Sequence, residues 1–168
     1  IHKAATKMVE EMGKDSETGE PPVEVTTSPK GVTIGISSDI SFEPGSATTK
    51  PGFLDILKKI VPTIEESYFM IAVEGHTDSD PLPKSLRERY PSNWELSGAR
   101  ASAVVRLLIG LEVDPTRLQS VGYGEFVPRD KNTAEIITTD LIQKYNSNPQ
   151  QKSRNRRVEI TFLAPNKL

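Results

Sequence analysis

Hydrophobic residues recur at spacings of three and four in several stretches of the chain, which is the pattern of a helix that buries one face. The strongest stripe predicts a helix over Gly52–Ser67. Pro62 should kink or shorten this helix, because proline lacks an amide hydrogen. The clearest helix is predicted over Trp94–Leu111, with Ser92 or Asn93 as its N-cap.

Alternating or continuous hydrophobic runs predict the strands. They are expected over Val23–Thr27, Gly31–Ser37, Tyr68–Glu74, Leu118–Tyr123 and Arg156–Leu163. A Ser-Pro-Lys-Gly turn separates the first two, which predicts a hairpin. Strands that alternate with helices at this spacing favour an α/β (α+β) sandwich, in which helices pack on one face of a small mixed β-sheet.

The segments outside these elements are polar. Residues 1–22 begin with a weak helical stripe and end in Pro-Pro, so they are predicted to be a linker or tail with a weak N-terminal helix. Residues 23–168 are predicted to form the domain. Within it, Gly75–Asn93 is expected to be a long polar loop. Phe126–Ser153 is expected to be irregular, with a short helix around Ile136–Lys144.

Composition narrows the class of protein. The 168 residues include 13 Pro and 11 Gly, and 35% are hydrophobic, so part of the chain should be loop rather than core. The net charge of −2 gives no field that would attract nucleic acid or anionic lipid. The absence of Cys excludes disulfides, thiol catalysis and Cys-ligated zinc.

Membrane and targeting signals are not visible in the sequence. The hydrophobic runs are shorter than the ~20 residues that cross a bilayer, and no signal peptide is recognisable. The chain begins at Ile1 rather than Met. We therefore expect it to be a piece of a longer protein, with a membrane or targeting segment upstream.

Three polar clusters are candidates for chemistry: Glu74–Asp80, Ser92–Ala101 and Asn155–Ile160. Each has a purely structural interpretation, namely a self-capping loop, a solvated helix charge and strand charges that discourage aggregation. The first cluster, however, follows a buried strand, and ligands in α/β sheets bind at the carboxyl ends of strands. Because the three clusters lie on elements that can converge, together they favour a ligand site.

Two other kinds of site receive little support. His76 with the nearby aspartates offers nitrogen and oxygen ligands, but the only other histidine is His2, and one His with carboxylates is a poor zinc set. A Ser79–His76 nucleophile–base pair lacks an oxyanion loop and an orienting partner at a useful spacing. We therefore predict no catalytic residue, no metal and no cofactor.

The polar clusters resemble the OmpA-like peptidoglycan-binding domain family. The shared motifs are Gly75-His76-Thr77-Asp78, Leu96-Ser97-Gly98-Ala99-Arg100-Ala101, Gly122-Tyr123-Gly124-Glu125 with Pro128, and Asn155-Arg156-Arg157-Val158-Glu159-Ile160. The family's Phe-x-x-Gly-Ser-Ala loop has its counterpart at Phe42–Ala47. The motifs follow the family's order from Val32 to Leu163, which implies the family's βαβαβ-type topology.

The long loop between Asp78 and Arg100 indicates a subgroup, because outer-membrane members generally have a shorter one. It resembles flagellar stator B subunits of the MotB and PomB kind. That resemblance implies a periplasmic domain that anchors a motor stator to the cell wall, held in the inner membrane by an upstream transmembrane helix. The implied partners are peptidoglycan, a second copy in a homodimer and a stator A subunit. The alternative is an outer-membrane-associated or lipoprotein-type wall linker without a motor role.

The resemblance also implies the ligand and the residues that bind it. The family binds the peptide stem of peptidoglycan at meso-diaminopimelate, which carries an ammonium and a carboxylate on one carbon. Asp78 is implied to accept from the ammonium, and Arg100 to bind the carboxylate through its planar donors. The further binding residues expected are Thr77 and Asn93 for neutral hydrogen bonds, Leu96 for an apolar wall, Phe42 on the loop that offers backbone groups, and Arg157 for a second cation at the rim.

Overall fold

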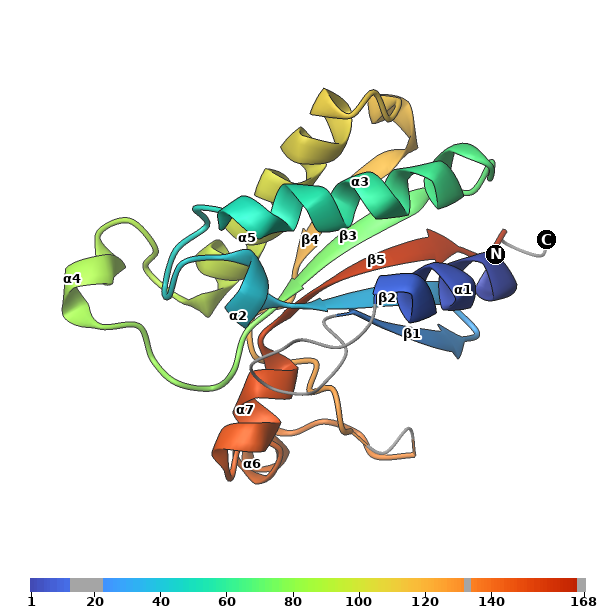
Figure 1. The fold of residues 1–168 in the computed structure, drawn as a ribbon. Helices are drawn as coiled ribbons and strands as arrows, with labels where there is room; N and C mark the ends of the chain where they lie inside the picture. The colour runs from blue at the N-terminus through green and yellow to red at the C-terminus, as the bar shows by residue number, and fades with distance from the viewer. Residues whose placement is uncertain (13–22, 132–133, 166–168) are drawn as a thin grey trace.

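A five-stranded mixed sheet carries the fold of the computed structural model, which describes residues 1–12, 23–131 and 134–165 (Figure 1). The strands are β1 (Val23–Ser28), β2 (Gly31–Ser37), β3 (Ile71–His76), β4 (Leu118–Gly122) and β5 (Arg157–Leu163). Their order across the sheet is β1-β2-β5-β3-β4, so the last strand in sequence is the central one. β3 and β4 are parallel, and the other neighbours are antiparallel.

Three long helices pack on one face of this sheet: α1 (His2–Met12), α3 (Pro51–Glu65) and α5 (Asn93–Gly110) (Figure 1). The order β2–α3–β3–α5–β4 is the expected βαβαβ arrangement. The shorter helices are α2 (Ser38–Ser41), α4 (Lys84–Arg87), the 3-10 turn η1 (Pro115–Arg117), α6 (Thr139–Lys144) and α7 (Pro149–Asn155). The predicted fold class is confirmed.

The core lies between the sheet and these helices. On β5 the side chains of Val158, Ile160 and Phe162 are buried against the helices, as the alternating pattern predicted. The buried stripe of α3 consists of Phe53, Leu57, Ile60, Thr63 and Ile64. Pro62 does not end that helix, which continues to Glu65.

The helix predicted near the N-terminus is present as α1 and is part of the same core. Ala5 is fully buried, and Met8 is 9% exposed and lies against α3, where Thr63 Oγ1 is 3.9 Å from its sulfur. The predicted linker at residues 15–22 lies outside the described residues. The boundary between a tail and a domain at residue 22 stays a prediction.

The opposite face of the sheet carries buried polar side chains. Thr161 donates to Glu74 Oε1 at 2.7 Å, and its hydroxyl lies 2.8 Å from that of Thr33. Lys30 also forms an ion pair with Glu74. A buried carboxylate needs such partners, because burial without them would cost several kcal/mol. The face of the sheet under the helices is therefore apolar, whereas the other face carries polar side chains that hydrogen-bond to one another.

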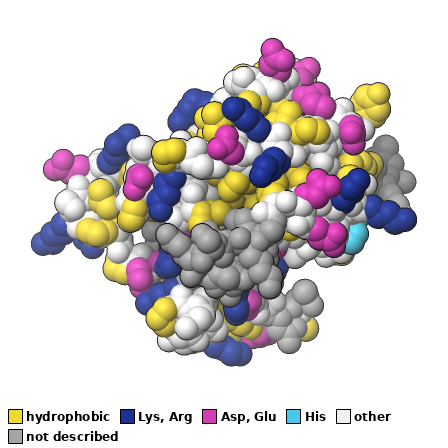
Figure 2. Space-filling model, in the orientation of Figure 1, with side chains coloured by type: hydrophobic (Ala, Val, Ile, Leu, Met, Phe, Trp, Pro, Cys, Tyr) yellow, Lys and Arg dark blue, Asp and Glu magenta, His cyan; other side chains and the backbone are white. Residues whose placement is uncertain are grey.

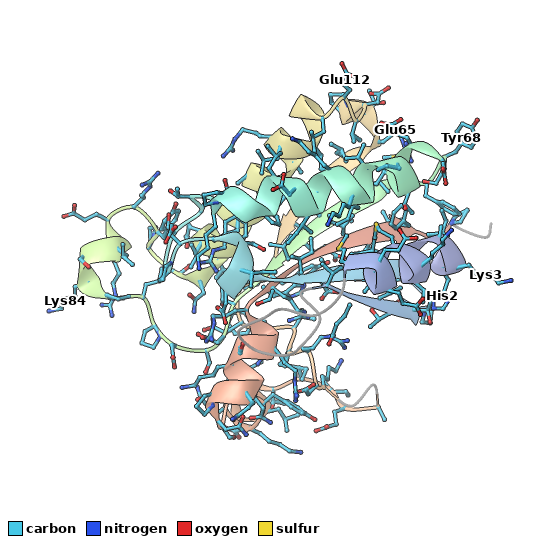
Figure 3. All side chains as sticks on the ribbon, in the orientation of Figure 1. His2, Lys3, Glu65, Tyr68, Lys84 and Glu112 are labelled. Atoms are coloured by element: carbon cyan, nitrogen blue, oxygen red, sulfur yellow. The ribbon has the colours of Figure 1, made fainter. Side chains whose placement is uncertain are left out.

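The two long loops contain more helix than the sequence pattern predicted. The loop after β3 includes α4, which projects from the sheet. Lys84, the first residue of α4, lies at the opposite end of the molecule from Tyr68, which follows α3 (Figure 3). In the segment after β4, α6 confirms the predicted short helix. α7 was not predicted, although Asn148 caps it by accepting from Gln151 N at 2.8 Å.

The face of the molecule drawn in Figure 2 shows no dominant sign of charge. Acidic and basic side chains are interspersed over the face in Figure 2, in agreement with the small net charge. Within the described part of the chain, the helices are all too short or too polar to cross a membrane.

Candidate functional site

The candidate site lies where β3 ends and α5 begins. α5 starts at Asn93, and the Ser92 hydroxyl caps it by accepting from Trp94 N at 3.2 Å. Two glycines allow the helix to lie close to the strands. A Cβ on Gly75 would be 2.1 Å from the Ser97 carbonyl oxygen, and one on Gly122 would be 2.6 Å from Gly98 N. This close approach fixes the N-terminal half of α5 against the end of β3.

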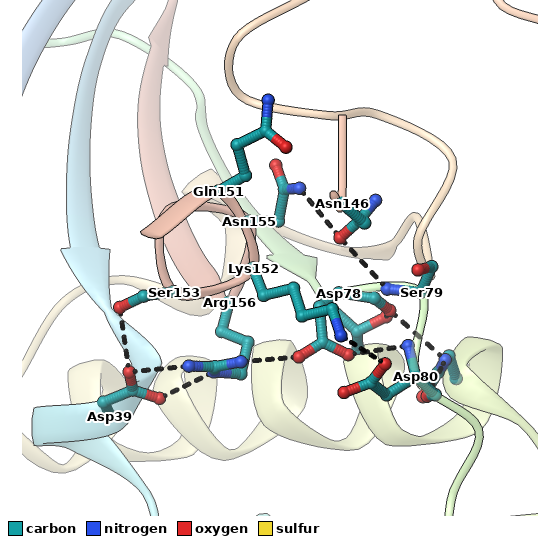
Figure 4. Close-up of polar contacts among 12 residues, drawn as sticks. Asp39, Asp78, Ser79, Asp80, Asn146, Gln151, Lys152, Ser153, Asn155 and Arg156 are labelled. Carbon is teal, nitrogen blue, oxygen red and sulfur yellow. Dashed lines mark hydrogen bonds and ion pairs between the residues drawn. The ribbon is translucent and has the colours of Figure 1, made fainter. Parts of the chain in front are cut away.

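Asp78, the first residue of the predicted ligand pair, is held by Arg156 (Figure 4). Arg156 Nη1 donates to Asp78 Oδ2 at 2.6 Å, while its Nε and Nη2 donate to Asp39 at 2.9 and 3.2 Å. The other Asp78 oxygen accepts from the amide of Asp80 at 2.9 Å. The hydrogen bonds to Asp39 raise the pKa of Arg156 above its ordinary value; burial opposes this rise, and Asp78 adds to it.

Arg100, the second residue of that pair, is 5% exposed and supports the loop after α2. Its Nε donates to the Ser46 carbonyl at 2.8 Å and its Nη2 to the Glu43 carbonyl at 3.4 Å. The guanidinium also lies 5.1 Å from the centre of the Phe42 ring. Burial lowers the pKa of Arg100 to about 10, which still leaves it charged at neutral pH.

Electrostatics connect Arg100 to the Asp39–Arg156–Asp78 group. Both aspartates oppose the effect of burial on the pKa of Arg100, whereas Arg156 adds to it. Two carboxylates and two guanidiniums therefore share one small region. Arg100 Nη1 has no hydrogen-bond partner among the described residues, so its two N–H groups remain for a ligand.

Three further residues of the predicted site, Thr77, Asn93 and Leu96, lie in or against the loop that follows β3. The Thr77 hydroxyl donates to the Asp78 carbonyl at 2.8 Å. Asn93 Nδ2 donates to the Asp80 carbonyl and to Glu125 Oε2, both at 3.1 Å. Leu96 is 4% exposed and packs in a small hydrophobic cluster at the foot of the loop after β3. In this structure these polar groups are engaged in shaping the loop.

The long segment after β4 supports this loop from the other side (Figure 4). Asn146 Oδ1 accepts from Ser79 N at 3.2 Å and from Asn155 Nδ2 at 3.0 Å. Lys152 Nζ lies 3.0 Å from Asp80 Oδ1. Asn155 belongs to the polar cluster Asn155–Ile160, which the sequence predicts as part of a ligand site. No local sequence pattern singles out Asn146 or Asp39. Their importance follows only from the folded arrangement.

Arg157 lies elsewhere. Successive side chains of a strand point to opposite faces, and Arg157 lies on the polar face of the sheet, away from Asp78. Its donors are bound to Glu159 at 2.7 Å and to the carbonyls of Asn155 and Val127 at 3.2 and 3.0 Å. The placement expected for Arg157 at the site is corrected: the cation beside Asp78 is Arg156. No observation tests a binding role for Arg157.

His76 also lies on the polar face. Its Nε2 is 3.3 Å from Glu159, and its ring stacks on Tyr123 with centroids 5.2 Å apart. Burial lowers the pKa of His76 well below 6.5, and the charges of Arg157 and Lys30 lower it further. The 3.3 Å contact does not require a charged ring, because a neutral one can donate from Nε2. In residues 1–12, 23–131 and 134–165, no group of three acidic or histidine side chains could hold a metal.

Sequence comparisons with known proteins identify the family of this chain. A sequence model of the OmpA family matches residues 41–156. The chain is 33% identical to the uncharacterized protein YtxE of Bacillus subtilis, covering 79% of this chain and 48% of the relative. It is 32% identical to Motility protein B of the same organism, with 92% and 53% covered. It is 30% identical to a protein of Escherichia coli named "Probable lipoprotein YiaD", with 83% and 55% covered.

Solved structures show the same fold. A MotB-like protein from Desulfovibrio vulgaris superposes with a TM-score of 0.71 at 25% identity, covering 97% of this chain and 93% of that one. The cell wall anchor of the T6SS from Pseudomonas aeruginosa gives 0.69 at 27%, with 98% and 97% covered. The periplasmic domain of Helicobacter pylori MotB gives 0.67 at 25%, with 92% and 86% covered. The chain spans about half the length of the curated relatives named above. It is a member of the OmpA family.

Proposed function

We propose that this domain binds peptidoglycan without covalent chemistry, at the zwitterionic end of a diaminopimelate side chain. The observation that carries the proposal is the group of opposite charges at the end of β3, in which Asp78 and Arg100 are coupled through Arg156 and Asp39. A zwitterion needs one fixed anion and one fixed cation close together. The described site offers both, on elements that the core holds in place.

The contacts suggest how the ligand enters. In the ligand-free protein Arg156 neutralises Asp78. The ammonium of the ligand takes the place of Arg156 at Asp78, and Arg156 keeps its two hydrogen bonds to Asp39. The carboxylate of the ligand then accepts from the free Nη1 of Arg100. Thr77, Asn93, Leu96 and Phe42 shape the loops around this pair rather than supply its charges.

Such a site holds one peptide stem modestly. A hydrogen bond to a charged group contributes about 1.5–3 kcal/mol, and association costs offset part of it. Firm attachment then comes from several domains on one polymer, beginning with the two copies of a homodimer. The domain acts as an anchor, not as a hydrolase. Incubation with purified cell wall should therefore release no muropeptides.

We further infer that the anchored machine is a flagellar stator. The support is the similarity to Motility protein B and to MotB periplasmic domains. In that role the domain lies in the periplasm, attached to the inner membrane by an upstream helix, and works with a stator A subunit. The second candidate is a wall linker without a motor role, which the similarity to YiaD and to the T6SS anchor supports.

The upstream sequence of the full-length protein separates these two roles. A transmembrane helix with an ion-binding Asp in its middle supports the stator, and loss of swimming without loss of flagella after gene deletion would agree with it. A lipid-modified Cys supports the wall linker.

The binding proposal is tested by calorimetric titration with meso-diaminopimelate. We expect Asp78→Asn, which keeps the shape of the side chain but removes its charge, to weaken binding about 10- to 150-fold. The same loss is not expected for Lys58→Ala, on the outer side of α3. Equal affinity of the wild-type and Asp78→Asn proteins would contradict the assignment.

A further inference from the structure

A groove lies beside the proposed diaminopimelate site. Its volume is about 520 Å³, and its floor is the face of α5 that carries the small residues Ala99 and Ala103. One wall is the loop around Ala47, and the other is the end of the long loop after β3, with Arg89 and Tyr90. Arg106 also lines the groove, about one helical turn after Ala103 on α5. The end of the long loop after β3 therefore builds one wall of the groove.

The two arginines of this groove are not neutralised. Arg89 and Arg106 are both exposed, and neither side chain forms an ion pair or hydrogen bond with any described residue. The Arg89 guanidinium lies over the Tyr90 ring, 5.6 Å from its centre. By contrast, Arg156 beside Asp78 and Arg157 on the polar sheet face each form an ion pair with a carboxylate. Two unpaired guanidiniums beside a groove favour an anion with carboxylate geometry.

Residues that line the groove are direct neighbours of residues at the Arg100 site. Ala47 follows Ser46, whose carbonyl accepts from Arg100, and Ala99 precedes Arg100 on α5. Tyr90 connects the two regions: it is 6% exposed, packs on Leu96, and is among the groups that oppose the effect of burial on the pKa of Arg100. A peptide held at Arg100 therefore has the groove beside it.

We propose that this groove binds a second carboxylate of the same peptidoglycan peptide, through Arg89 and Arg106. The proposal rests on the proposed function, and it adds a specificity: the domain distinguishes stems with a free glutamate carboxylate from stems in which that group is amidated. A neutral amide cannot accept the charge-assisted hydrogen bonds of a guanidinium with the same strength.

The test uses three probes with the 168-residue chain: meso-diaminopimelate alone, the tripeptide L-alanyl-γ-D-glutamyl-meso-diaminopimelate, and the same tripeptide with its glutamate amidated. Binding is measured by calorimetry at low and at physiological salt. We expect the wild type to bind the free tripeptide about tenfold more tightly than the amidated one, equivalent to about 1.4 kcal/mol. The double variant Arg89→Gln/Arg106→Gln should remove this difference and leave the affinity for diaminopimelate unchanged.

A charge-matched control is Lys58→Ala/Lys59→Ala, which removes two exposed positive charges from α3 and should retain the tenfold preference. If the arginine double variant keeps the preference while Asp78→Asn loses all binding, the groove proposal is wrong and the proposed function stands. If the wild type binds none of the probes, both fail. If tetraglutamate binds the wild type as well as the tripeptide does and is lost in the double variant, the groove takes acidic peptides in general and the peptidoglycan assignment is overturned.

Discussion

Adding a single methyl group at Gly75 should force α5 away from the sheet. A Cβ at this position would lie 2.1 Å from the carbonyl oxygen of Ser97, 2.9 Å from its carbonyl carbon and 3.2 Å from its Cα. Contacts below 3.0 Å are essentially never observed for a Cβ, so the gap must widen by about 0.9 Å. Because the obstacle is backbone, no side chain can rotate away to accommodate the methyl group.

The loss in the free energy of unfolding caused by Gly75→Ala follows from the packing of α5. Overpacking a well-packed interior costs about 1–3 kcal/mol, and we expect Gly75→Ala at the upper end, about 3 kcal/mol, since a whole helix must shift. The shift also moves Asn93 and Arg100, which α5 carries, relative to Asp78 at the end of β3. Ligand binding should therefore weaken even under conditions in which the variant is folded.

Gly98→Ala, on α5 itself, is the matched control for Gly75→Ala on β3. A Cβ at Gly98 meets no atom within 4 Å, so alanine there should stabilise the protein by up to about 1 kcal/mol through its better helix propensity. Urea denaturation of the three proteins gives the free energies of unfolding. A Gly75→Ala variant within about 0.5 kcal/mol of wild type would refute the argument that this close approach positions α5.

Two further predictions concern the polar sheet face and the N-terminal helix. Burial lowers the pKa of His76 well below 6.5, so as the pH falls through 6.5 this side chain takes up a proton in the unfolded protein before it does so in the folded one. The free energy of unfolding should then fall by about 1.4 kcal/mol per pH unit. Urea denaturation at pH 7.5, 6.5 and 5.5 should show that His76→Gln has lost this part of the pH dependence. Equal slopes would refute the assignment of a neutral buried ring. Met8→Ala should lower the free energy of unfolding by about 2 kcal/mol, because Met8 packs in the core against α3; no change would show that α1 is not part of the folded unit.

Hydrophobic periodicity predicted the elements that touch the core. The hydrophobic stripes of α3 and α5 and the alternation in β5 each correspond to a buried face. Because these faces must be apolar, the pattern is recognisable in the sequence. The helix in which Pro62 lies continues to Glu65 because a proline in the last turn removes only one helical hydrogen bond there. α7 was missed because it makes few core contacts: Asn155 is its buried residue, and the signal that could have found it is Asn148 followed by Pro149.

The site was only partly predictable, for a geometric reason. The motifs singled out Asp78 and Arg100 as candidates, and the chemistry that recommends them does not depend on knowing the fold. Arg156 and Arg157 are consecutive, so their side chains point to opposite sides of the sheet, and only one of them can face Asp78. A shift of one residue in the strand register would exchange them, and the sequence does not fix the register that closely. Asp39 lies in a short helix far away in sequence, and only the pairing of β2 with β5 brings it to Arg156.

The most direct test of the central claim is co-sedimentation of the domain with purified, insoluble peptidoglycan. The wild-type protein should pellet with the polymer, and an excess of free meso-diaminopimelate should return it to the supernatant. Asp78→Asn should remain in the supernatant with a melting temperature that shows it is folded. The account would be contradicted if folded Asp78→Asn pelleted as fully as the wild type, or if free diaminopimelate failed to displace the wild-type protein.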